Sequence, residues 1–352
     1  MRRAAGPGRT TGTGVLCVLA ASVLWGTTGT AATLAPDVGP LAIGAVAMGV
    51  GGLLQALFAA PRIARHAVRL RDQRGTVLLG AASVAVYPLA FYSSMHLAGV
   101  AVGTVVSIGT APLASALIER AVDGHRLTRR WTTAAALGLL GTVLLCAAEA
   151  AHAADDTGRA SVAGTLLGVA LGLVAAATYA LYSWAAHRLI TRGTPSRAAM
   201  GAVFGLGGLL LLPVLAVTGA PLVSSWSNAA VGAYMALVPM FVGYVLFGWG
   251  LAHVPASTAT TLSLLEPAVA AVLAVAVVGE RLPAAGWAGT ALVVTCLAVL
   301  TTPARRPRRH PDGPFRDPDA RDVRDADPAR PGVFERARAL RRQVRSARSR
   351  RA

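Results

Sequence analysis

Residues 264–287 read LLEPAVAAVLAVAVVGERLPAAGW and place one carboxylate, Glu266, inside an otherwise apolar run. A charged group near the middle of a bilayer costs about 2.5–3.5 kcal/mol on insertion scales, so such residues are usually kept for pairing or for function. Pro267 follows directly, and because proline lacks a backbone N–H it loosens a helix at that point. The stretch therefore predicts a membrane-spanning helix with a loosened backbone and a candidate functional acid.

The composition of the whole chain indicates an integral membrane protein. Of its 352 residues, 54% are hydrophobic and only 14% are charged, and the mean hydropathy of +0.56 is high for a soluble domain. No charged residue lies between Gly75 and Ile118 or between Ala198 and Leu265. Because one span needs about 20 apolar residues, each of these runs is long enough for about two spans.

Apolar runs bounded by charge, proline or glycine predict an all-α protein with ten transmembrane helices. The backbone must satisfy its own hydrogen bonds in lipid, and the runs are too long for membrane β-strands. The predicted helices cover residues 13–33, 38–60, 76–97, 100–119, 131–150, 161–187, 198–218, 228–252, 255–278 and 285–302.

The distribution of arginine predicts the orientation. With the N-terminus in the cytoplasm, the cytoplasmic segments before the tail hold 15 arginines, and only Arg159 and Arg281 lie outside. The positive-inside rule thus predicts a multi-pass protein of the cell membrane with both termini cytoplasmic. Arg2 and Arg3 before an apolar run resemble the start of a signal peptide, but many spans follow, so we interpret this run as the first retained span.

Residues 303–352 form a basic tail rich in Arg, Asp and Pro, which we expect to be cytoplasmic and largely disordered. Apolar residues recur at helical spacing beyond Pro331. Two interpretations stay open: a short helix lying on anionic lipid, and a solvated tail that only reinforces the orientation. We expect no nucleic-acid binding, because no suitable fold or aromatic platform accompanies the charge.

The two halves of the chain are related by an internal repeat. A shift of 155 residues lays Ala111-Pro112 on Glu266-Pro267, and lays residues 124–127, Gly-His-Arg-Leu, on residues 279–282, Gly-Glu-Arg-Leu. Each half holds five spans, an odd number, so the second half enters the membrane with the opposite orientation. The predicted organisation is an N-terminus (1–12), two inverted five-helix repeats (13–150 and 151–302) and the tail (303–352). Many secondary transporters place their substrate between such halves.

These motifs resemble the EamA-type members of the drug/metabolite transporter superfamily. The resemblance covers residues 13–302 and is carried by Leu265-Glu266-Pro267, by residues 279–282, by residues 286–289 (Gly-Trp-Ala-Gly) and by Leu24-Trp25-Gly26. It implies a ten-helix carrier that exports or exchanges small metabolites, often amino-acid-like or drug-like, and is typically coupled to an ion gradient. The first half has Ala111 and His125 where the second has Glu266 and Glu280, so any role of either acid is asymmetric.

Glu266 is the first candidate site residue. A desolvated carboxylate favours its protonated form, so it could carry a coupling proton or pair with a cationic substrate. The structural alternative places Glu266 near the cytoplasmic end of its helix, where it would bond a neighbouring helix and fix packing. Glu280 and Arg281, on the following outer loop, are expected to be boundary features of the membrane interface rather than substrate contacts.

Aromatic and hydroxyl side chains are the further candidates for substrate or proton contacts. Aromatic rings inside the spans could line a cavity, and packing is the equally weighted alternative. The hydroxyls before the two shared prolines, Pro112 and Pro267, are expected mostly to make interhelical hydrogen bonds, and the prolines to act as hinges. These candidates are Trp25, Tyr92, Tyr179, Tyr182, Tyr244, Thr110 and Ser263.

The sequence thus predicts a secondary active transporter that moves a small amino-acid-like or drug-like metabolite by alternating access, with efflux as the expected direction. A non-transport membrane sensor or assembly protein is the alternative from another class. No catalytic constellation, metal-ligand spacing or cofactor motif occurs, so we expect neither an enzyme nor a cofactor. Expected partners are the small-molecule substrate and membrane lipid, while a coupling proton or other ion and a homodimer remain open.

Overall fold

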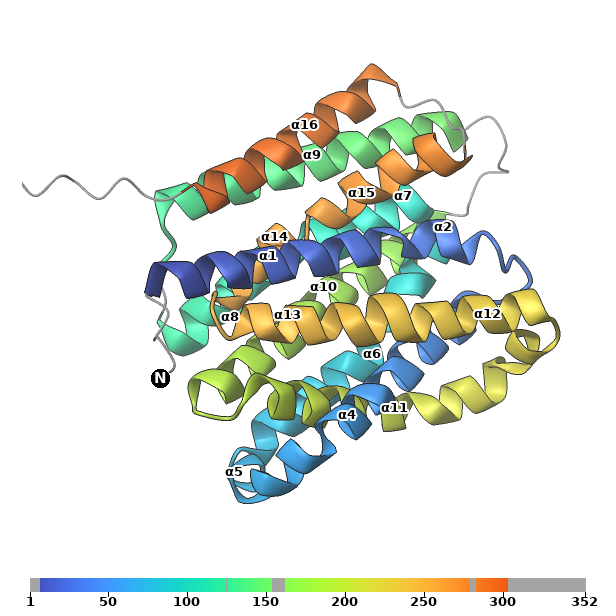
Figure 1. The fold of residues 1–352 in the computed structure, drawn as a ribbon. Coiled ribbons are helices and arrows are strands. Elements are labelled where there is room, and N and C mark those ends of the chain that lie inside the picture. The colour runs from blue at the N-terminus through green and yellow to red at the C-terminus, as the bar shows by residue number, and fades with distance from the viewer. Residues whose placement is uncertain (1–6, 125, 154–161, 279–282, 303–352) are drawn as a thin grey trace, which may run out of the picture. The chain divides into compact units, whose positions relative to one another are not determined.

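The computed structural model describes residues 7–124, 126–153, 162–278 and 283–302, and this part of the chain consists of helices without a strand (Figure 1). The prediction of an all-α protein is confirmed for these residues. The elements of the first half are α1 (Pro7–Gly26), α2 (Thr28–Ala32), α3 (Pro40–Gly44), η1 (Ala45–Val50), α4 (Gly51–Arg65), α5 (Ala67–Asp72), α6 (Arg74–Ala98), α7 (Val100–Thr104), η2 (Val105–Gly109), α8 (Ala111–Asp123) and α9 (Arg129–Ala153).

The second half has the same helical character. Its elements are α10 (Val162–Thr191), α11 (Ser196–Thr218), η3 (Ala220–Val223), α12 (Trp226–Met235), η4 (Ala236–Val242), α13 (Gly243–Leu251), α14 (Ala256–Leu262), α15 (Leu265–Leu273), η5 (Ala274–Val278) and α16 (Ala284–Thr301). The predicted tail and the predicted boundary residues Glu280 and Arg281 lie outside the described residues.

Nine helical segments of the described chain are long and apolar enough to cross a membrane. Each corresponds to one of the predicted spans, and the remaining predicted span coincides with α9, which is helical over Arg129–Ala153. The outward faces of these segments carry large apolar side chains, such as Leu57, Leu117 and Val217. Such exposed apolar surface suits contact with lipid, so the chain is a multi-pass membrane protein.

The structure differs from the predicted spans at several places. The fourth span is divided at Thr110, between η2 and α8. The first span is interrupted at Thr27, between α1 and α2. The connection after the second span is partly helical, because α4 continues to Arg65 and α5 follows. The ninth span is divided at residues 263–264 into α14 and α15, where the backbone N–H of Glu266 bonds the Ser263 carbonyl.

Helices far apart in sequence pack side by side. The structure places α10 along α6, α9 along α16 and α4 along α11, while α1 lies against α13 and α15 (Figure 1). Glycine permits the closest of these contacts: a Cβ atom on Gly52 of α4 would clash with the Phe204 carbonyl oxygen of α11. Small residues at a crossing let two membrane helices approach closely.

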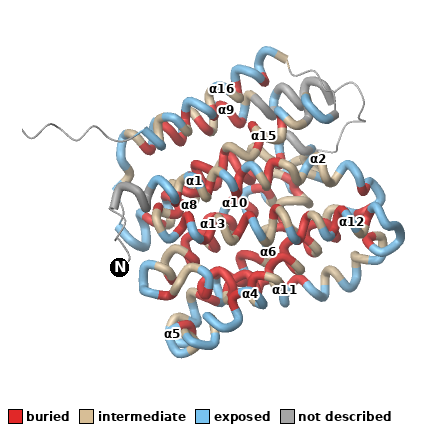
Figure 2. Tube along the Cα trace, viewed as in Figure 1, coloured by how far each residue is buried: buried red, intermediate tan, exposed pale blue. Residues whose placement is uncertain are grey.

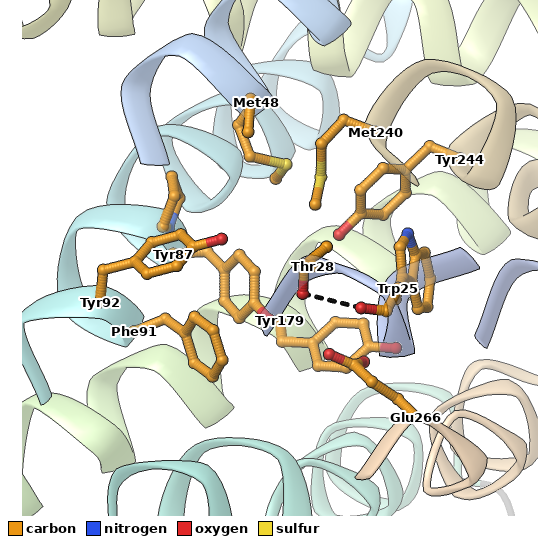
Figure 3. Close-up of a pocket in the computed structure, with 12 residues that line it drawn as sticks. Trp25, Thr28, Met48, Tyr87, Phe91, Tyr92, Tyr179, Met240, Tyr244 and Glu266 are labelled. Atoms are coloured by element: carbon orange, nitrogen blue, oxygen red, sulfur yellow. Dashed lines mark hydrogen bonds between the residues drawn. The ribbon is translucent and has the colours of Figure 1, made fainter. Parts of the chain in front are cut away.

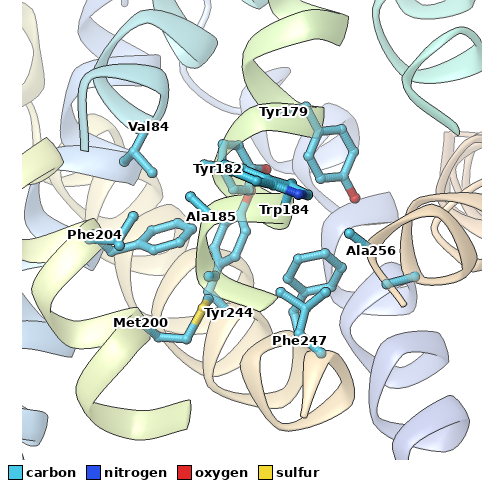
Figure 4. Close-up of a cluster of buried hydrophobic side chains, with 14 of the residues drawn as sticks. Val84, Tyr179, Tyr182, Trp184, Ala185, Met200, Phe204, Tyr244, Phe247 and Ala256 are labelled. Atoms are coloured by element: carbon cyan, nitrogen blue, oxygen red, sulfur yellow. The ribbon is translucent and has the colours of Figure 1, made fainter. Parts of the chain in front are cut away.

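The buried residues gather where these helices meet (Figure 2). The main cluster includes Tyr182 of α10, Phe204 of α11, and Tyr244 and Phe247 of α13, whose rings lie close together (Figure 4). The Phe204 and Tyr244 ring centroids are 4.4 Å apart. Aromatic rings thus cluster within this buried core, beside the candidate site.

Candidate functional site

A small cavity between the two halves collects most of the predicted site residues (Figure 3). Its volume is about 20 Å³, which is enough for about one water molecule. The first half contributes Trp25, Thr28, Met48, Tyr87, Phe91 and Tyr92 to its lining, and the second contributes Tyr179, Met240, Tyr244 and Glu266. Aromatic rings therefore form most of the wall, and Glu266 is the one charged group among these described lining residues.

Glu266 occupies the first turn of α15, directly after the break that divides the ninth span. The candidate span runs over Ala256–Val277, and Glu266 is ten residues after its first residue. The side chain is half-buried and reaches the cavity. Its carboxylate has no hydrogen-bond or ion-pair partner among the described residues. An unpaired acid within an apolar span is available to a proton or to a solute cation.

The two shared prolines occupy equivalent places at helix breaks. Pro112 is the second residue of α8, which follows the π-helical segment η2, and Pro267 is the third residue of α15, which follows the break at 263–264. The first turn of a helix tolerates proline, because its missing N–H would have no intrahelical partner there. Both prolines thus begin the second part of a divided span.

Trp25 joins α1 to the irregular segment η4. Its indole Nε1–H donates a 2.9 Å hydrogen bond to the Pro239 carbonyl oxygen, 214 residues away in the chain. The Trp25 ring packs against the Tyr244 ring with 4.8 Å between centroids. The Tyr244 hydroxyl in turn lies 2.7 Å from the Tyr182 hydroxyl. Tyr182 does not line the cavity itself but contacts residues that do, Tyr244 among them.

Tyr179 is held beside the break in the ninth span. Its hydroxyl donates a 2.8 Å hydrogen bond to Ser263 Oγ, and Ser263 Oγ donates a 2.8 Å bond to the Thr260 carbonyl oxygen. All three residues are buried. Ser263, a predicted substrate contact, is instead bonded to a residue that lines the cavity.

The predicted contact Thr110, and two further threonines before Pro267, bond within their own helical segments. Thr110 Oγ1 donates to the Val106 carbonyl oxygen, and Thr260 Oγ1 and Thr261 Oγ1 donate to carbonyls one turn earlier. The expectation of mostly interhelical bonds is therefore wrong for these threonines. A threonine hydroxyl finds a carbonyl of the preceding turn within reach, which satisfies it without a second helix.

Several residues that line the cavity are not among the predicted contacts. Tyr87 stacks on Phe91 one helical turn later, with 5.6 Å between ring centroids and an interplanar angle of 17°. Tyr87 also lies 5.6 Å from the Tyr179 ring. The spacing of four residues between Tyr87 and Phe91 was a usable signal. The sequence gives no such signal for Met48 and Met240, because methionine fills gaps in apolar cores of any kind.

Comparison with known proteins relates the chain to membrane transporters. The model of the EamA-like transporter family matches residues 12–147 and 166–302. The uncharacterized transporter YwfM of Bacillus subtilis (strain 168) is 35% identical over 292 residues, which cover 83% of this chain and 94% of that protein.

Two further relatives carry descriptions of their cargo. The threonine/homoserine exporter RhtA of Escherichia coli (strain K12) is 27% identical over 270 residues, covering 76% of this chain and 84% of RhtA. A probable terminal-alkyne amino-acid exporter of Streptantibioticus cattleyicolor is 26% identical over 254 residues, covering 70% and 80%. The relatives are transporters and exporters rather than enzymes. Matched by the family model over both halves, the chain belongs to the EamA-like transporter family.

Proposed function

We propose that this protein is a secondary transporter that exports a small amino-acid-like solute across the cytoplasmic membrane by alternating access. The observation that carries the proposal is the convergence of Glu266 and aromatic rings from both halves on one cavity. Secondary transporters built from inverted repeats bind their substrates at such a midplane position between the halves.

The packing pattern supports two halves related by an inverted repeat. The contact of α10 with α6 has its counterpart in the contact of α1 with α13, and the contact of α10 with α8 in that of α1 with α15. The pairs α4 with α11 and α9 with α16 each join equivalent helices of the two halves. In this proposal α9 is the tenth span, residues 13–150 and 151–302 are the repeats, and both termini are cytoplasmic.

The lining of the cavity favours a solute with an ammonium group. The Glu266 carboxylate supplies one negative charge, and the faces of rings such as Tyr87 and Tyr179 attract cations. An amino acid carries such a group. The kinship with RhtA, a threonine/homoserine exporter, and with the probable terminal-alkyne amino-acid exporter supports the same class of cargo and the same direction.

The cavity is too small for an amino acid in the conformation described. A volume of about 20 Å³ holds about one water molecule, so substrate binding requires the surrounding helices to separate. The divided spans provide places for this movement, because α14 meets α15 at a break and α7 meets α8 through η2. In this mechanism Pro112 and Pro267 act as hinges.

Glu266 also suits proton coupling. A carboxylate at this position can bind either a proton or the ammonium group of a solute. A proton and a substrate cation would therefore compete for one site. Exchange of the two across the membrane would use an inward proton gradient to drive export.

Reconstituted vesicles test the proposal. Purified protein in liposomes should give saturable flux of L-threonine or L-homoserine that responds to an imposed pH gradient. Glu266→Gln should lower this flux about tenfold or more, because a charge-assisted hydrogen bond contributes about 1.5–3 kcal/mol, and should remove its pH dependence. Glu266→Asp, which keeps the charge, should retain part of the flux.

Asp37→Asn is the matched control, because it removes an exposed acid that does not line the cavity. Flux equal to that of empty vesicles for a broad panel of metabolites would favour the non-transport alternative. Normal flux with an unchanged pH profile in Glu266→Gln would keep transport but remove the role of Glu266. Comparing the metabolites exported by cells with and without the gene would identify the cargo.

A further inference from the structure

A second and larger cavity lies between the C-terminal ends of α8 and α10 and the start of α14. Its volume is about 340 Å³, within the range typical of small-molecule sites. Its polar lining consists of Glu119 and Asp123 from α8 and of His187, Arg188, Thr191 and Arg192 from the end of α10. Charges of both signs thus meet in one hollow, and its lining shares no residue with that of the central cavity.

Glu119 attaches α8 to the start of α14. The side chain is buried, with 3% of its surface exposed. One carboxylate oxygen accepts the backbone N–H of Ser257 at 3.2 Å, and the other accepts the Ser257 hydroxyl at 2.5 Å. The acid caps the first turn of α14, where free N–H groups favour a negative charge. In the sequence Glu119 stands at the edge of an apolar run, far from its partner Ser257, so the sequence alone predicts no role for it.

Asp123 attaches the same helix to α10. It lies four residues after Glu119 and therefore on the same face of α8. Its Oδ2 atom accepts a 2.6 Å hydrogen bond from the Trp184 indole, and its Oδ1 atom forms an ion pair with Arg188. The Arg188 guanidinium also lies 4.9 Å from the centre of the Trp184 ring. Two carboxylates on one helix thus hold the ends of both neighbouring helices.

Arg192 supplies the available positive charge. Its exposed guanidinium has no hydrogen-bond or ion-pair partner within the described part of the chain. His187 is fixed elsewhere, because its Nδ1 atom lies 2.7 Å from the Leu251 carbonyl oxygen. A small ligand with one carboxylate and one ammonium group would find a partner for each: Arg192 for the first, and the α8 carboxylates for the second.

We propose that this cavity is a docking site for the zwitterionic head of an amino-acid-like solute, occupied before the solute reaches the central cavity. The inference rests on the proposed function for the class of solute and for the cytoplasmic position of these helix ends. The bound ammonium group competes with Arg188 for Asp123 and with Ser257 for Glu119. Docking therefore loosens α8 from α10 and α14, the two helices that carry Tyr179 and the break before Glu266.

Thiol protection at Thr191 tests this site directly. Thr191 lines the cavity and is exposed, so Thr191→Cys can be placed in a chain whose native cysteines, Cys17, Cys146 and Cys296, are replaced by alanine. Labelling by a hydrophilic maleimide is then followed in nanodiscs. L-Threonine, L-homoserine and L-alanine should each slow the labelling, about twofold when the amino acid reaches its dissociation constant.

Matched analogues define the recognised head group. The corresponding amines, which lack the carboxylate, and the hydroxy acids, which lack the ammonium group, should slow the labelling of Thr191→Cys clearly less. Arg71→Cys, an exposed position on α5 that does not line the cavity, serves as the labelling control and should not be protected. Arg192→Gln should abolish protection of Thr191→Cys, while Arg71→Gln should leave it unchanged.

The outcomes separate this proposal from the function on which it rests. Protection without flux in liposomes would support the docking site and reject transport of these amino acids. Flux without protection by any of the three amino acids would reject the docking site and keep the transport function. Protection that survives Arg192→Gln but disappears in Glu266→Gln would place the ligand in the central cavity and overturn the proposal.

Discussion

The hydroxyl of Tyr179 donates a 2.8 Å hydrogen bond to the hydroxyl of Ser263, at the point where the ninth span breaks. One ring thereby both lines the central cavity and is fixed to the backbone turn that precedes Glu266. The position of the Tyr179 ring and the geometry of the break depend on each other, so a change at either residue should affect solute binding.

Tyr179→Phe should raise the KM for the transported solute while leaving the fold intact. The variant keeps the ring but loses one buried hydrogen bond, which contributes about 0.5–1.5 kcal/mol, so KM should rise about two- to tenfold. Flux in liposomes at several substrate concentrations measures this. Tyr234→Phe is the control, because its hydroxyl lies 2.7 Å from that of Thr27, outside the cavity lining. An equal rise in both variants would contradict a specific role for Tyr179.

Trp25→Phe should lower the solute flux of the folded protein. The indole bond to the Pro239 carbonyl disappears, and with it a link between α1 and η4 beside the cavity. A loss of about 1 kcal/mol corresponds to about a fivefold lower flux. Trp226→Phe, at a position that is 88% exposed, is the matched control and should transport normally. Wild-type flux in Trp25→Phe would show that this link is dispensable.

Gly52→Ala should destabilise the protein. The new Cβ would clash with the Phe204 carbonyl oxygen, so α4 and α11 must move apart and lose contact along their length. We expect a lower free energy of unfolding, by about 1–3 kcal/mol, as for other overpacked sites. Unfolding in SDS followed by tryptophan fluorescence measures the change.

Gly75→Ala is the control for this steric effect. A Cβ atom at Gly75 meets nothing within 4 Å, and alanine favours a helix over glycine by about 0.5–1 kcal/mol. Its stability should therefore equal or exceed that of the wild type. Equal destabilisation by the two substitutions would argue against close packing of α4 on α11.

Ser257→Ala should weaken the attachment of α8 to α14. The buried Glu119 carboxylate would keep the backbone N–H of residue 257 but lose the hydroxyl. Leaving part of a buried charged group without a partner costs about 1–3 kcal/mol of unfolding free energy. Thr295→Ala, which removes an exposed hydroxyl bonded within its own helix, should change the stability little. A melting temperature unchanged in both variants would contradict the role given to Glu119.

The sequence by itself determined the fold class, an all-α protein with several membrane spans. Long apolar runs in lipid can satisfy their backbone groups only as helices, and the described spans follow the predicted ranges closely. The repeated Pro112 and Pro267 predicted where two spans would be loosened, and the structure has a break beside each. The motifs around Glu266 also predicted the family, which the comparison of the whole chain confirmed.

Only the tertiary structure decided which side chains meet. The sequence pattern did not distinguish a cavity position from a packing position for Trp25, Tyr92, Tyr179 and Tyr244. Their convergence with Glu266 depends on contacts between helices about two hundred residues apart in the chain. Glu119 was missed for the same reason, because its partner Ser257 lies 138 residues away. Backbone hydrogen bonding in lipid is local and can be read from a run of residues, whereas the pairing of side chains depends on how the helices pack.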